Sequence, residues 1–545
     1  MSETSITEGA ASSLPRLTRG TLTASVAACF IAQIGVSIPA TTQGYVNLDL
    51  HTTSTQLTWV SDAFMVPVTL FELTFGVLGD LFGRKRLLWI GGLLMVIGAL
   101  TAFLTPEGHV NQLLTGQAIA GFGAAALFPT SVAMIAAGTH TVHERAHSIS
   151  IWAAALTTGG FMSPLIAGIL ARIHHSGGDY ASWRWAFLAE AILAAISVVI
   201  TLVAAQNSSA PRGRALDWPG QITVAVGLFA LLFAVVQGSD AGWGSGTVIG
   251  AFIVAVVFLA AFVAIEVRVD KPLIQLDLFA NRMFAISAVV TVLGMFAYLG
   301  TAYATSIRLS AIQTYSPLKT SIAFILLNIM GVVLFPVSTK MLQRFNPGWV
   351  LSLGMALIGI GDLALAIIPS TNPSIPAIAV PLLVVGAGFK TAVTAITVVA
   401  VNSVPTEKAG MASGATSMLR DMGLTLGPAI VAAIALTNAA NSIAAKVTAS
   451  PSLHKAVDAF NASSQVPPAV KGAVNSGPLG ANAIPAPLNP LKDVAFHALS
   501  HGYALGYLAC AIGGLLAAAI AAVALGGRQH EEKFVENADV VAELF

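Results

Sequence analysis

The sequence predicts an all-α polytopic membrane protein, and three observations lead to this fold class. First, 56% of the 545 residues are hydrophobic and only 9% are charged, whereas soluble domains carry about 25% charged residues. Second, apolar runs of about twenty residues, enough for one helix to cross a bilayer, recur along the whole chain. Third, Lys and Arg are distributed unevenly between the loops that join these runs, as is typical of membrane proteins with a fixed topology.

Fourteen apolar runs are long enough to be transmembrane helices. An even number places both chain ends on one side of the membrane. The predicted helices lie near residues 22–43, 57–79, 86–105, 110–137, 147–171, 185–204, 217–238, 246–267, 283–306, 320–341, 348–369, 375–403, 411–437 and 498–526.

The basic residues give the orientation. With both termini inside, the inside loops and tails hold sixteen Lys and Arg residues, whereas the short outside loops hold Arg172, Arg184, Arg308 and Lys319. Because basic residues concentrate on the cytoplasmic side, we expect cytoplasmic termini and a location in the inner or plasma membrane.

The helix pattern predicts two six-helix bundles with an inserted helix pair between them. The long outside loop is rich in Ala, Ser, Asn and Pro, so we expect a partly ordered flap with short helices and no hydrophobic core of its own. The predicted parts are a tail at 1–20, a bundle at 21–205, the inserted pair with its linkers at 206–272, a bundle at 273–527 that includes the outside loop 438–495, and a tail at 528–545.

The segment Gly76–Arg86, GVLGDLFGRKR, ends the second apolar run and forms a short basic loop before the third. Small residues at Gly76 and Gly79 allow close helix packing in a membrane, and Gly83 allows a tight turn. This loop resembles the signature G-x-L-a-D-r-x-G-r-k between helices 2 and 3 of the major facilitator superfamily. The resemblance implies that fold, with paired halves and a substrate site between them.

Four further stretches resemble the fourteen-helix drug:proton antiporters of that superfamily, the EmrB/QacA-like multidrug exporters. TWVSDAFMV, SWRWAFLAE and AGMASGATSMLRDMG are similar to family patterns in helices 2, 6 and 13. In helix 5, Gly160, Pro164 and Gly168 match the antiporter motif G-x-x-x-G-P-x-x-G-G, while Ser163 and Ala167 replace two of its glycines. The resemblance implies export by alternating access coupled to proton antiport.

Two charged positions of the family pattern are absent from this sequence. Gly35 stands where the helix 1 aspartate is usual, and Gln117 stands at the usual arginine of helix 4. Loss of both partners is balanced, because removal of one alone would leave an uncompensated charge in a low-dielectric environment. Another carboxyl group must therefore carry the proton if coupling is retained.

Ionisable residues inside predicted helices are functional candidates, because each costs about 2.5–3.5 kcal/mol to insert at the membrane centre. Glu72 is the main candidate for proton coupling; the alternative is a structural hydrogen bond from a protonated carboxyl. Asp62 is expected nearer the outer mouth, in a solvated or helix-positioning role, and Glu190 is expected either to couple or to pair with Arg184 or Arg172. Asp362 is the fourth candidate.

Lys390 and Asp362 lie at similar depths in neighbouring predicted helices. Either they form a buried ion pair, or Lys390 faces the central cavity and attracts anionic groups. For conformational gating, the resemblance implies that the aspartate of the signature loop interacts with the start of helix 13; a purely structural pairing of Asp80 with Arg84 or Arg86 is the alternative. The gating candidates are Gly76, Asp80, Gly83, Arg84, Arg86, Arg420 and Asp421.

Apolar pockets with a few polar groups suit amphiphilic small molecules. The substrate-cavity candidates are Gln33, Gln43, Phe64, Gln117, Phe324, Asn328 and Lys390. No nucleotide-binding loop, nucleophile elbow or catalytic metal motif is present, and the histidines lack ligand partners at suitable spacing. We therefore expect no cofactor, no metal and no enzymatic activity, and energy from an ion or substrate gradient.

We predict a secondary transporter that exports lipophilic or amphiphilic small molecules by proton antiport, with neutral or anionic compounds favoured by Lys390 and the missing helix 1 acid. One alternative is an uncoupled transporter of lipids or anionic metabolites; another is a membrane scaffold or sensor without transport activity. The expected partners are a small-molecule substrate, protons and membrane lipid. A net charge of +1 gives no reason to expect nucleic acid, and we expect a monomer.

Overall fold

A computed structural model describes residues 17–139, 142–178, 180–209, 216–269, 272–404 and 409–526. Across these ranges the chain is helical, without a β-strand. The tails predicted at 1–20 and 528–545 lie almost entirely outside the described residues. The long helices are α2 (Arg19–Leu50), α3 (Ser54–Phe82), α4 (Arg84–Phe103), α5 (Val110–Gly138), α6 (Val142–Leu170), α7 (Arg184–Ala204), α8 (Trp218–Ala241), α9 (Gly246–Glu266), α10 (Arg282–Ser306), α11 (Pro317–Val333), α13 (Pro347–Ile367), α14 (Ile375–Asn402), α15 (Ala409–Ala449) and α19 (Lys492–Leu525).

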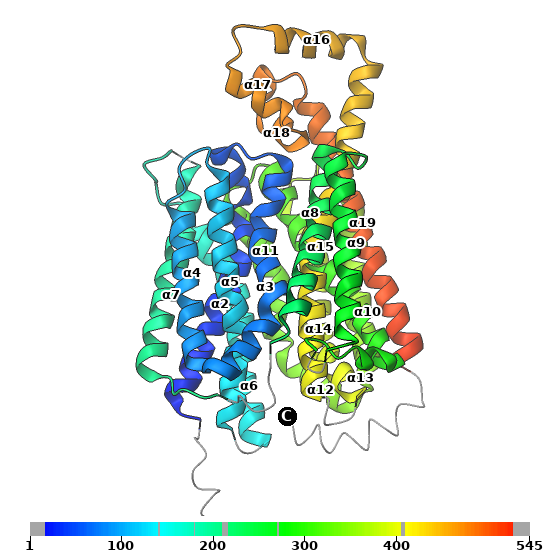
Figure 1. Ribbon diagram of the computed structural model, residues 1–545. Coiled ribbons are helices and arrows are strands. Elements are labelled where there is room, and N and C mark those ends of the chain that lie inside the picture. Colours follow the sequence, from blue (N-terminus) through cyan, green and yellow to red (C-terminus); the bar gives the residue numbers. More distant parts are fainter. Residues whose placement is uncertain are drawn as a thin grey trace, which may run out of the picture.

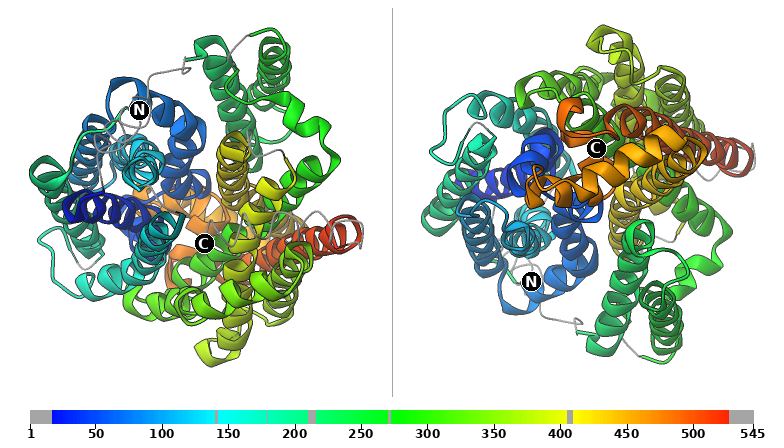
Figure 2. Two further views of the ribbon diagram at one scale, coloured as in Figure 1. Left: turned by 90° about the horizontal axis from the view of Figure 1, so that it is seen from below. Right: turned by 90° about the horizontal axis from the view of Figure 1, so that it is seen from above.

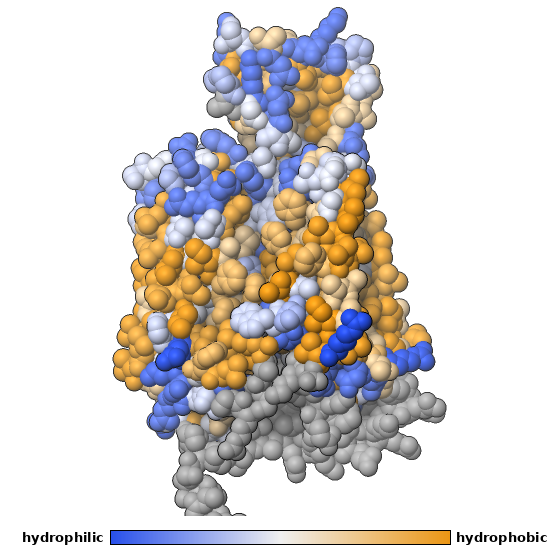
Figure 3. Space-filling model, in the orientation of Figure 1, coloured by the Kyte–Doolittle hydropathy of each residue, from blue (hydrophilic) through white to orange (hydrophobic). Residues whose placement is uncertain are grey.

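The predicted all-helical membrane fold is confirmed. Thirteen helices in the described part of the chain are long and apolar enough to cross a membrane, and α11 is a shorter apolar helix. Apolar side chains cover the middle of the bundle on the face that Figure 3 shows, and hydrophilic ones gather towards its ends. The chain is therefore a multi-pass membrane protein.

One predicted helix, 320–341, is divided. α11 ends at Val333, and α12 (Phe335–Arg344) begins after a break at Leu334. Pro336 lies in the first turn of α12, where a residue without an N–H group is tolerated, whereas inside a continuous helix it would remove a hydrogen bond.

The described chain begins and ends at the same end of the bundle. Figure 1 shows the start of α2 and the end of α19 at the lower end, which we call the tail face; the opposite end, beneath α16–α18, is the cap face. Seen along the bundle, α8 and α9 lie side by side at its edge (Figure 2). α8 packs against α3 and α15, which places the inserted pair beside both predicted bundles. The division of the chain at residues 205 and 272 stays a prediction.

A repeated contact relates two pairs of helices. In α4 and α5, a Cβ atom added at Gly98 would meet the Gly116 carbonyl oxygen at 2.5 Å. In α13 and α14, a Cβ atom added at Gly361 would meet the Pro381 carbonyl oxygen at 2.9 Å. Small residues at such crossings let helix backbones approach closely in a membrane, so the two pairs are built alike.

The outside loop forms a compact cap, which corrects one prediction. α15 extends to Ala449 and is followed by α16 (Pro451–Ala462), α17 (Pro468–Asn475), α18 (Pro478–Ala483) and the 3-10 turn η5 (Ala486–Leu488). Contrary to expectation, this segment has its own small hydrophobic core around Phe460, Val474 and Leu491. The prediction failed because these apolar residues are spread over several short helices and form no continuous run.

The cap is attached to the bundle by Asn482, whose side-chain amide donates to the carbonyl oxygen of Ala311 at 2.9 Å. Ala311 belongs to a π-helical segment, η3 (Ile307–Ile312), that continues α10. Seen from above, the cap lies over the centre of the bundle (Figure 2). Any movement of α10 at the cap face would therefore also act on the cap.

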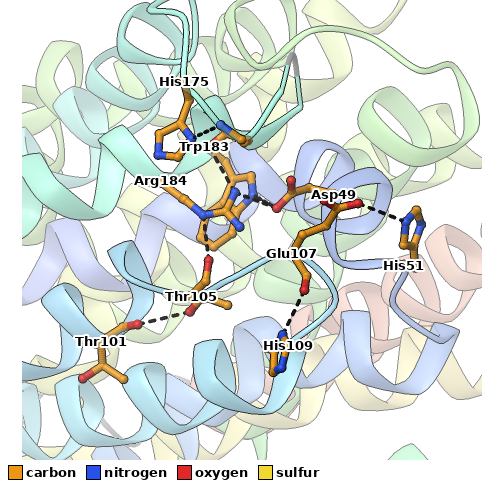
Figure 4. A network of polar contacts seen from close by, with 11 residues as sticks. Asp49, His51, Thr101, Thr105, Glu107, His109, His175, Trp183 and Arg184 are labelled. Carbon is orange, nitrogen blue, oxygen red and sulfur yellow. Dashed lines mark hydrogen bonds and ion pairs between the residues drawn. The ribbon is translucent and has the colours of Figure 1, made fainter.

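A buried network ties together the loops of α2–α7 at the cap face (Figure 4). Arg184 forms an ion pair with Asp49 at 2.7 Å, and Asp49 also accepts a hydrogen bond from the Trp183 indole at 3.0 Å. Burial lowers the pKa of His175 below its usual value, and nearby Arg184 adds to the effect. The neutral ring accepts the Gly177 N–H at 3.0 Å. Arg184 is therefore not the partner of Glu190 that the sequence suggested.

Replacement of Asp49 with Ala is expected to destabilise the protein by about 3–5 kcal/mol, because it leaves the Arg184 charge buried without its partner. Thermal unfolding of the detergent-purified protein would show this as a lower midpoint. The matched control is Glu107→Ala, which removes an exposed partner of His51 and should change stability by no more than about 1 kcal/mol. Equal effects of the two substitutions would contradict a stabilising role for the buried pair.

Candidate functional site

A cavity of about 1000 Å³ opens between α3, α5 and α6 on one side and α15 on the other. It extends from Asp80 and Asp217 at the tail-face end to Glu72 and Arg420 deeper in the bundle. Its apolar wall includes Phe128, Pro129, Trp152, Leu156 and Trp218. The cavity therefore combines charged groups with aromatic surface, and its volume is at the upper end of the range for small-molecule pockets.

Glu72 lies where α3 meets α15. Its carboxyl group lies close to the carboxyl group of Asp421 and to Arg420. Arg420 donates from Nε to Asp421 at 2.8 Å. Two carboxyl groups in contact are stable only when a proton lies between them or a cation compensates their charge. The site can therefore hold or release a proton, with Arg420 available to stabilise the ionised form.

At the cap face, hydrogen bonds close the interface between α2–α3 and α10. Ser306 donates to the Gln43 side chain at 2.6 Å, and Gln43 donates to Ser61 at 2.9 Å. Thr58 and Tyr303 share a hydrogen bond of 2.9 Å. The cavity thus lies on the tail side of an interface that is closed at the cap face.

The signature loop makes its own ion pair in this state. Asp80 binds Arg84 at 2.7 Å, which is the structural alternative considered for Asp80, while Arg86 is exposed. Gly83 has a φ of 101° and lies at the turn between α3 and α4, a conformation that L-residues with side chains rarely adopt. Asp80, Gly76, Arg84 and Arg420 all line the cavity. Their gating role stays a prediction.

The other three proton-coupling candidates do not line this cavity. Asp62 is fully buried, and neither of its carboxyl oxygens has a hydrogen-bond donor in the described residues, so the expected solvated position is wrong. Asp362 accepts a hydrogen bond from Thr301. It makes no ion pair with Lys390, which excludes the expected pairing of these two described side chains.

Glu190 faces α2. A Cβ atom added at Gly35 would lie 2.8 Å from the Glu190 Oε1 atom and 2.7 Å from the Phe64 ring. Glu190 is buried, and this oxygen has no hydrogen-bond donor among the described residues. A carboxyl group from α7 therefore approaches the position where the family resemblance led us to expect one from helix 1.

The predicted substrate-cavity residues lie outside the tail-face cavity in this state. Gln33 and Asn328 come together beside Gly160: a Cβ atom there would be 3.5 Å from the Gln33 amide nitrogen and 3.3 Å from the Asn328 side-chain oxygen. Tyr298 approaches Asn328 at 3.4 Å, and its ring stacks on Phe389, next to Lys390. The structure thus groups Gln33, Asn328 and Gly160 between α2, α6 and α11.

The remaining candidates pack in the helix bundle. Gln117, Phe64 and Phe324 are buried. Gly168 packs against Ser321 of α11, and Pro164 lies inside α6. The substrate roles of all these residues stay predictions.

Sequence reasoning missed most of the cavity wall, including Trp152 and Trp218, because it considered polar groups near mid-membrane. It also missed a second copy of the antiporter motif, whose first copy lies in α6. Gly427 and Pro428 in α15 repeat the Ser163–Pro164 pair of α6, and each position approaches the backbone of the neighbouring helix, α10 or α2. The four-residue spacing from Gly423 to Gly427, as from Gly159 to Ser163, was the available signal. This spacing places the first glycine of the motif at Gly159, so the predicted match of Gly160 was wrong by one residue.

The sequence matches the family description "Major Facilitator Superfamily" over residues 23–428. The chain belongs to the major facilitator superfamily. Members of this superfamily are transporters, which agrees with the closed cap-face interface and the cavity between helices of this facilitator.

Several relatives of this facilitator are named as resistance proteins. It is 30% identical to the Multidrug resistance protein Stp of Mycobacterium tuberculosis (strain CDC 1551 / Oshkosh), over 69% of this chain and 68% of Stp. It is 25% identical to the Methylenomycin A resistance protein of Streptomyces coelicolor, over 76% and 85% of the two chains. It is 23% identical to the Tetracenomycin C resistance and export protein of Streptomyces glaucescens, over 75% of this chain and 74% of that protein.

Solved structures support the fold alone. A mutant of the peptide transporter POT aligns with a TM-score of 0.58 at 15% identity, over 94% of this chain and 97% of that chain. A bacterial homolog of the human lysosomal transporter Spinster, in an inward-facing conformation, aligns with a TM-score of 0.57 at 13% identity. The alignment covers 96% of this chain and 99% of that chain.

Proposed function

We propose that this facilitator exports lipophilic or amphiphilic small molecules from the cell by alternating access. The observation that carries the proposal is the cavity of about 1000 Å³ with its mixed aromatic and charged wall. The names of the relatives, which include multidrug resistance and export proteins, support the direction of transport.

The tail face is assigned to the cytoplasm of a plasma or inner membrane. The basic loop with Arg84, Lys85 and Arg86 lies at this face, and such loops are retained in the cytoplasm. In this assignment the structure is open towards the cytoplasm, so a substrate enters the cavity from the cytoplasm or the inner leaflet. Release outside requires the hydrogen bonds of Gln43 and Tyr303 at the cap face to break.

Proton antiport is proposed to use Glu72. Of the four candidate carboxyl groups, only Glu72 lines the cavity, and it lies beside Asp421 and Arg420 of the facing helix. Release of its proton to the cytoplasm leaves a carboxylate that Arg420 stabilises. When the cavity opens at the cap face, uptake of an external proton lets Glu72 share it with Asp421 and favours return of the inward-open state. Each cycle then exchanges a substrate for a proton.

A reconstituted flux measurement tests this function. Proteoliposomes loaded with ethidium or fluorescein are compared with and without a pH gradient. Gradient-dependent movement of at least one compound supports proton antiport, whereas movement that ignores the gradient supports the uncoupled alternative. Absence of flux for a wide panel of amphiphilic compounds would contradict the transporter assignment.

Lys390 is proposed to favour anionic substrates. It is buried next to Phe389, whose ring stacks on Tyr298, and a cation in a low-dielectric site attracts an anionic group. Lys390→Ala is expected to lower fluorescein transport about tenfold and to leave ethidium transport nearly unchanged. Lys319→Ala, at an exposed lysine, is the control. Unchanged transport of every anionic compound by Lys390→Ala would refute the preference.

A further inference from the structure

Two carboxyl groups face each other at the base of the inserted helix pair. Asp217 is the N-cap of α8, and Glu266 is the last residue of α9. A Cβ atom added at Gly220 would be 2.2 Å from Asp217 Oδ2 and 2.8 Å from Glu266 Oε1. These two oxygens are at most about 5 Å apart. The two carboxyl groups therefore lie close to each other.

Among the residues that the structure describes, no cation pairs with either carboxyl group. Asp217 is 6% exposed and Glu266 is 4% exposed, and in the described part of the chain the facing oxygens receive no hydrogen bond from a donor group. Among the described residues, the charged groups on the surrounding elements are Glu72 and Asp80 of α3, Arg420 and Asp421 of α15, and Arg84 and Arg268 at the tail face. Arg84 pairs with Asp80, Arg420 pairs with Asp421, and Arg268 is exposed.

The pair also holds one wall of the cavity. Glu266 Oε2 accepts the backbone N–H of Ile274 at 3.3 Å, and residues 272–275 line the cavity. Asp217 lines the cavity and accepts the Gly220 N–H at 2.8 Å. One residue further along α8, Gln221 donates to the Leu70 carbonyl oxygen of α3 at 2.7 Å. The two carboxyl groups thus connect the start of α8 with the end of α9 and with the linker that follows α9.

We propose that Asp217 and Glu266 form a second proton-binding site, separate from Glu72, which makes access to the cavity depend on the proton concentration at the tail face. With one shared proton, the carboxyl groups hydrogen bond and hold residues 272–275 in place. Without it, two like charges are forced together in a buried site and repel each other. The linker is therefore held at low pH and released as the pH rises.

Thiol labelling of the full-length protein tests the site without measuring transport. Gln275→Cys places a thiol on the linker, and both native cysteines, Cys29 and Cys510, are buried. The rate of reaction with a polar maleimide is measured between about pH 5.5 and about pH 8.5. It is divided by the rate for Arg344→Cys, at an exposed position that does not line the cavity, which removes the intrinsic pH dependence of thiol reactivity.

The normalised rate is expected to rise about threefold or more with pH. Glu266→Gln should keep it at the low value, because a glutamine amide can donate to Asp217 and its oxygen can still accept from Ile274. Asp217→Asn serves as a second variant that retains a capping side chain, and exposed Glu107→Gln is the control with an unchanged profile. A rise that persists in both pair variants, a flat profile in the parent, or a rate set by sodium concentration at fixed pH would overturn the proposal.

Discussion

Replacement of Glu72 with Gln is expected to abolish transport driven by a pH gradient, with a loss of at least about tenfold, while substrate binding changes by less than about threefold. Gln keeps the size and hydrogen-bonding capacity of the side chain but carries no exchangeable carboxyl proton. Since Glu72 lies beside Asp421 and Arg420 and also lines the cavity, the substitution removes coupling at the point where α3 meets α15. Flux and equilibrium binding of ethidium in proteoliposomes and detergent measure the two effects.

Glu190→Gln is the matched comparison. Glu190 is also buried, but it faces Gly35 and Phe64 and does not line the cavity. We expect it to retain gradient-driven transport. If Glu190→Gln abolishes that transport and Glu72→Gln does not, the coupling acid is the carboxyl group beside Gly35, and the assignment of Glu72 is wrong.

A reversible cross-link across the cap face is expected to stop transport completely. Gln43 and Ser306 are hydrogen bonded between α2 and α10 at 2.6 Å. Cysteines at these two positions, bridged by a short bis-methanethiosulfonate reagent, would hold the cap face closed, so substrate could enter the cavity but could not leave on the other side. Reductant should restore transport of ethidium or of any other transported compound.

The control for the cross-link joins two residues in one bundle. Asn47 of α2 and Thr52, which follows α2, are hydrogen bonded at 2.8 Å, and both precede α3. Bridging cysteines at these positions should leave transport unchanged. Full transport with the Gln43–Ser306 bridge in place would show that this interface does not open during the cycle.

The helices were predictable from the sequence because their signal is local. Apolar runs of sufficient length indicate the helices that cross the membrane. The direction of the crossings, which the basic loops indicate, stays a prediction. Two features of the fold were not predicted, because neither is encoded in a continuous apolar run. The break before α12 depends on Pro336 in the first turn of a helix, and the cap core depends on Phe460 and Val474 meeting across separate short helices.

The site was predictable only in part because its geometry is tertiary. Glu72 stood out as an acid in an apolar run, and the structure places it in the cavity. The sequence could not show that Asp362 bonds to Thr301 and not to Lys390, since pairing between helices depends on their rotation. It also could not show that Glu190 reaches the space beside Gly35, because these residues lie on different helices, α7 and α2.

The proton movement that accompanies substrate transport tests the central claim most directly. Proteoliposomes with the tail face outward contain a pH-sensitive dye, and a compound that the protein transports is added outside without a pH gradient. Proton antiport predicts that the lumen becomes more alkaline as the compound enters, and that Glu72→Gln shows no pH change. Entry of the compound with a luminal pH equal to that of protein-free liposomes would contradict the account.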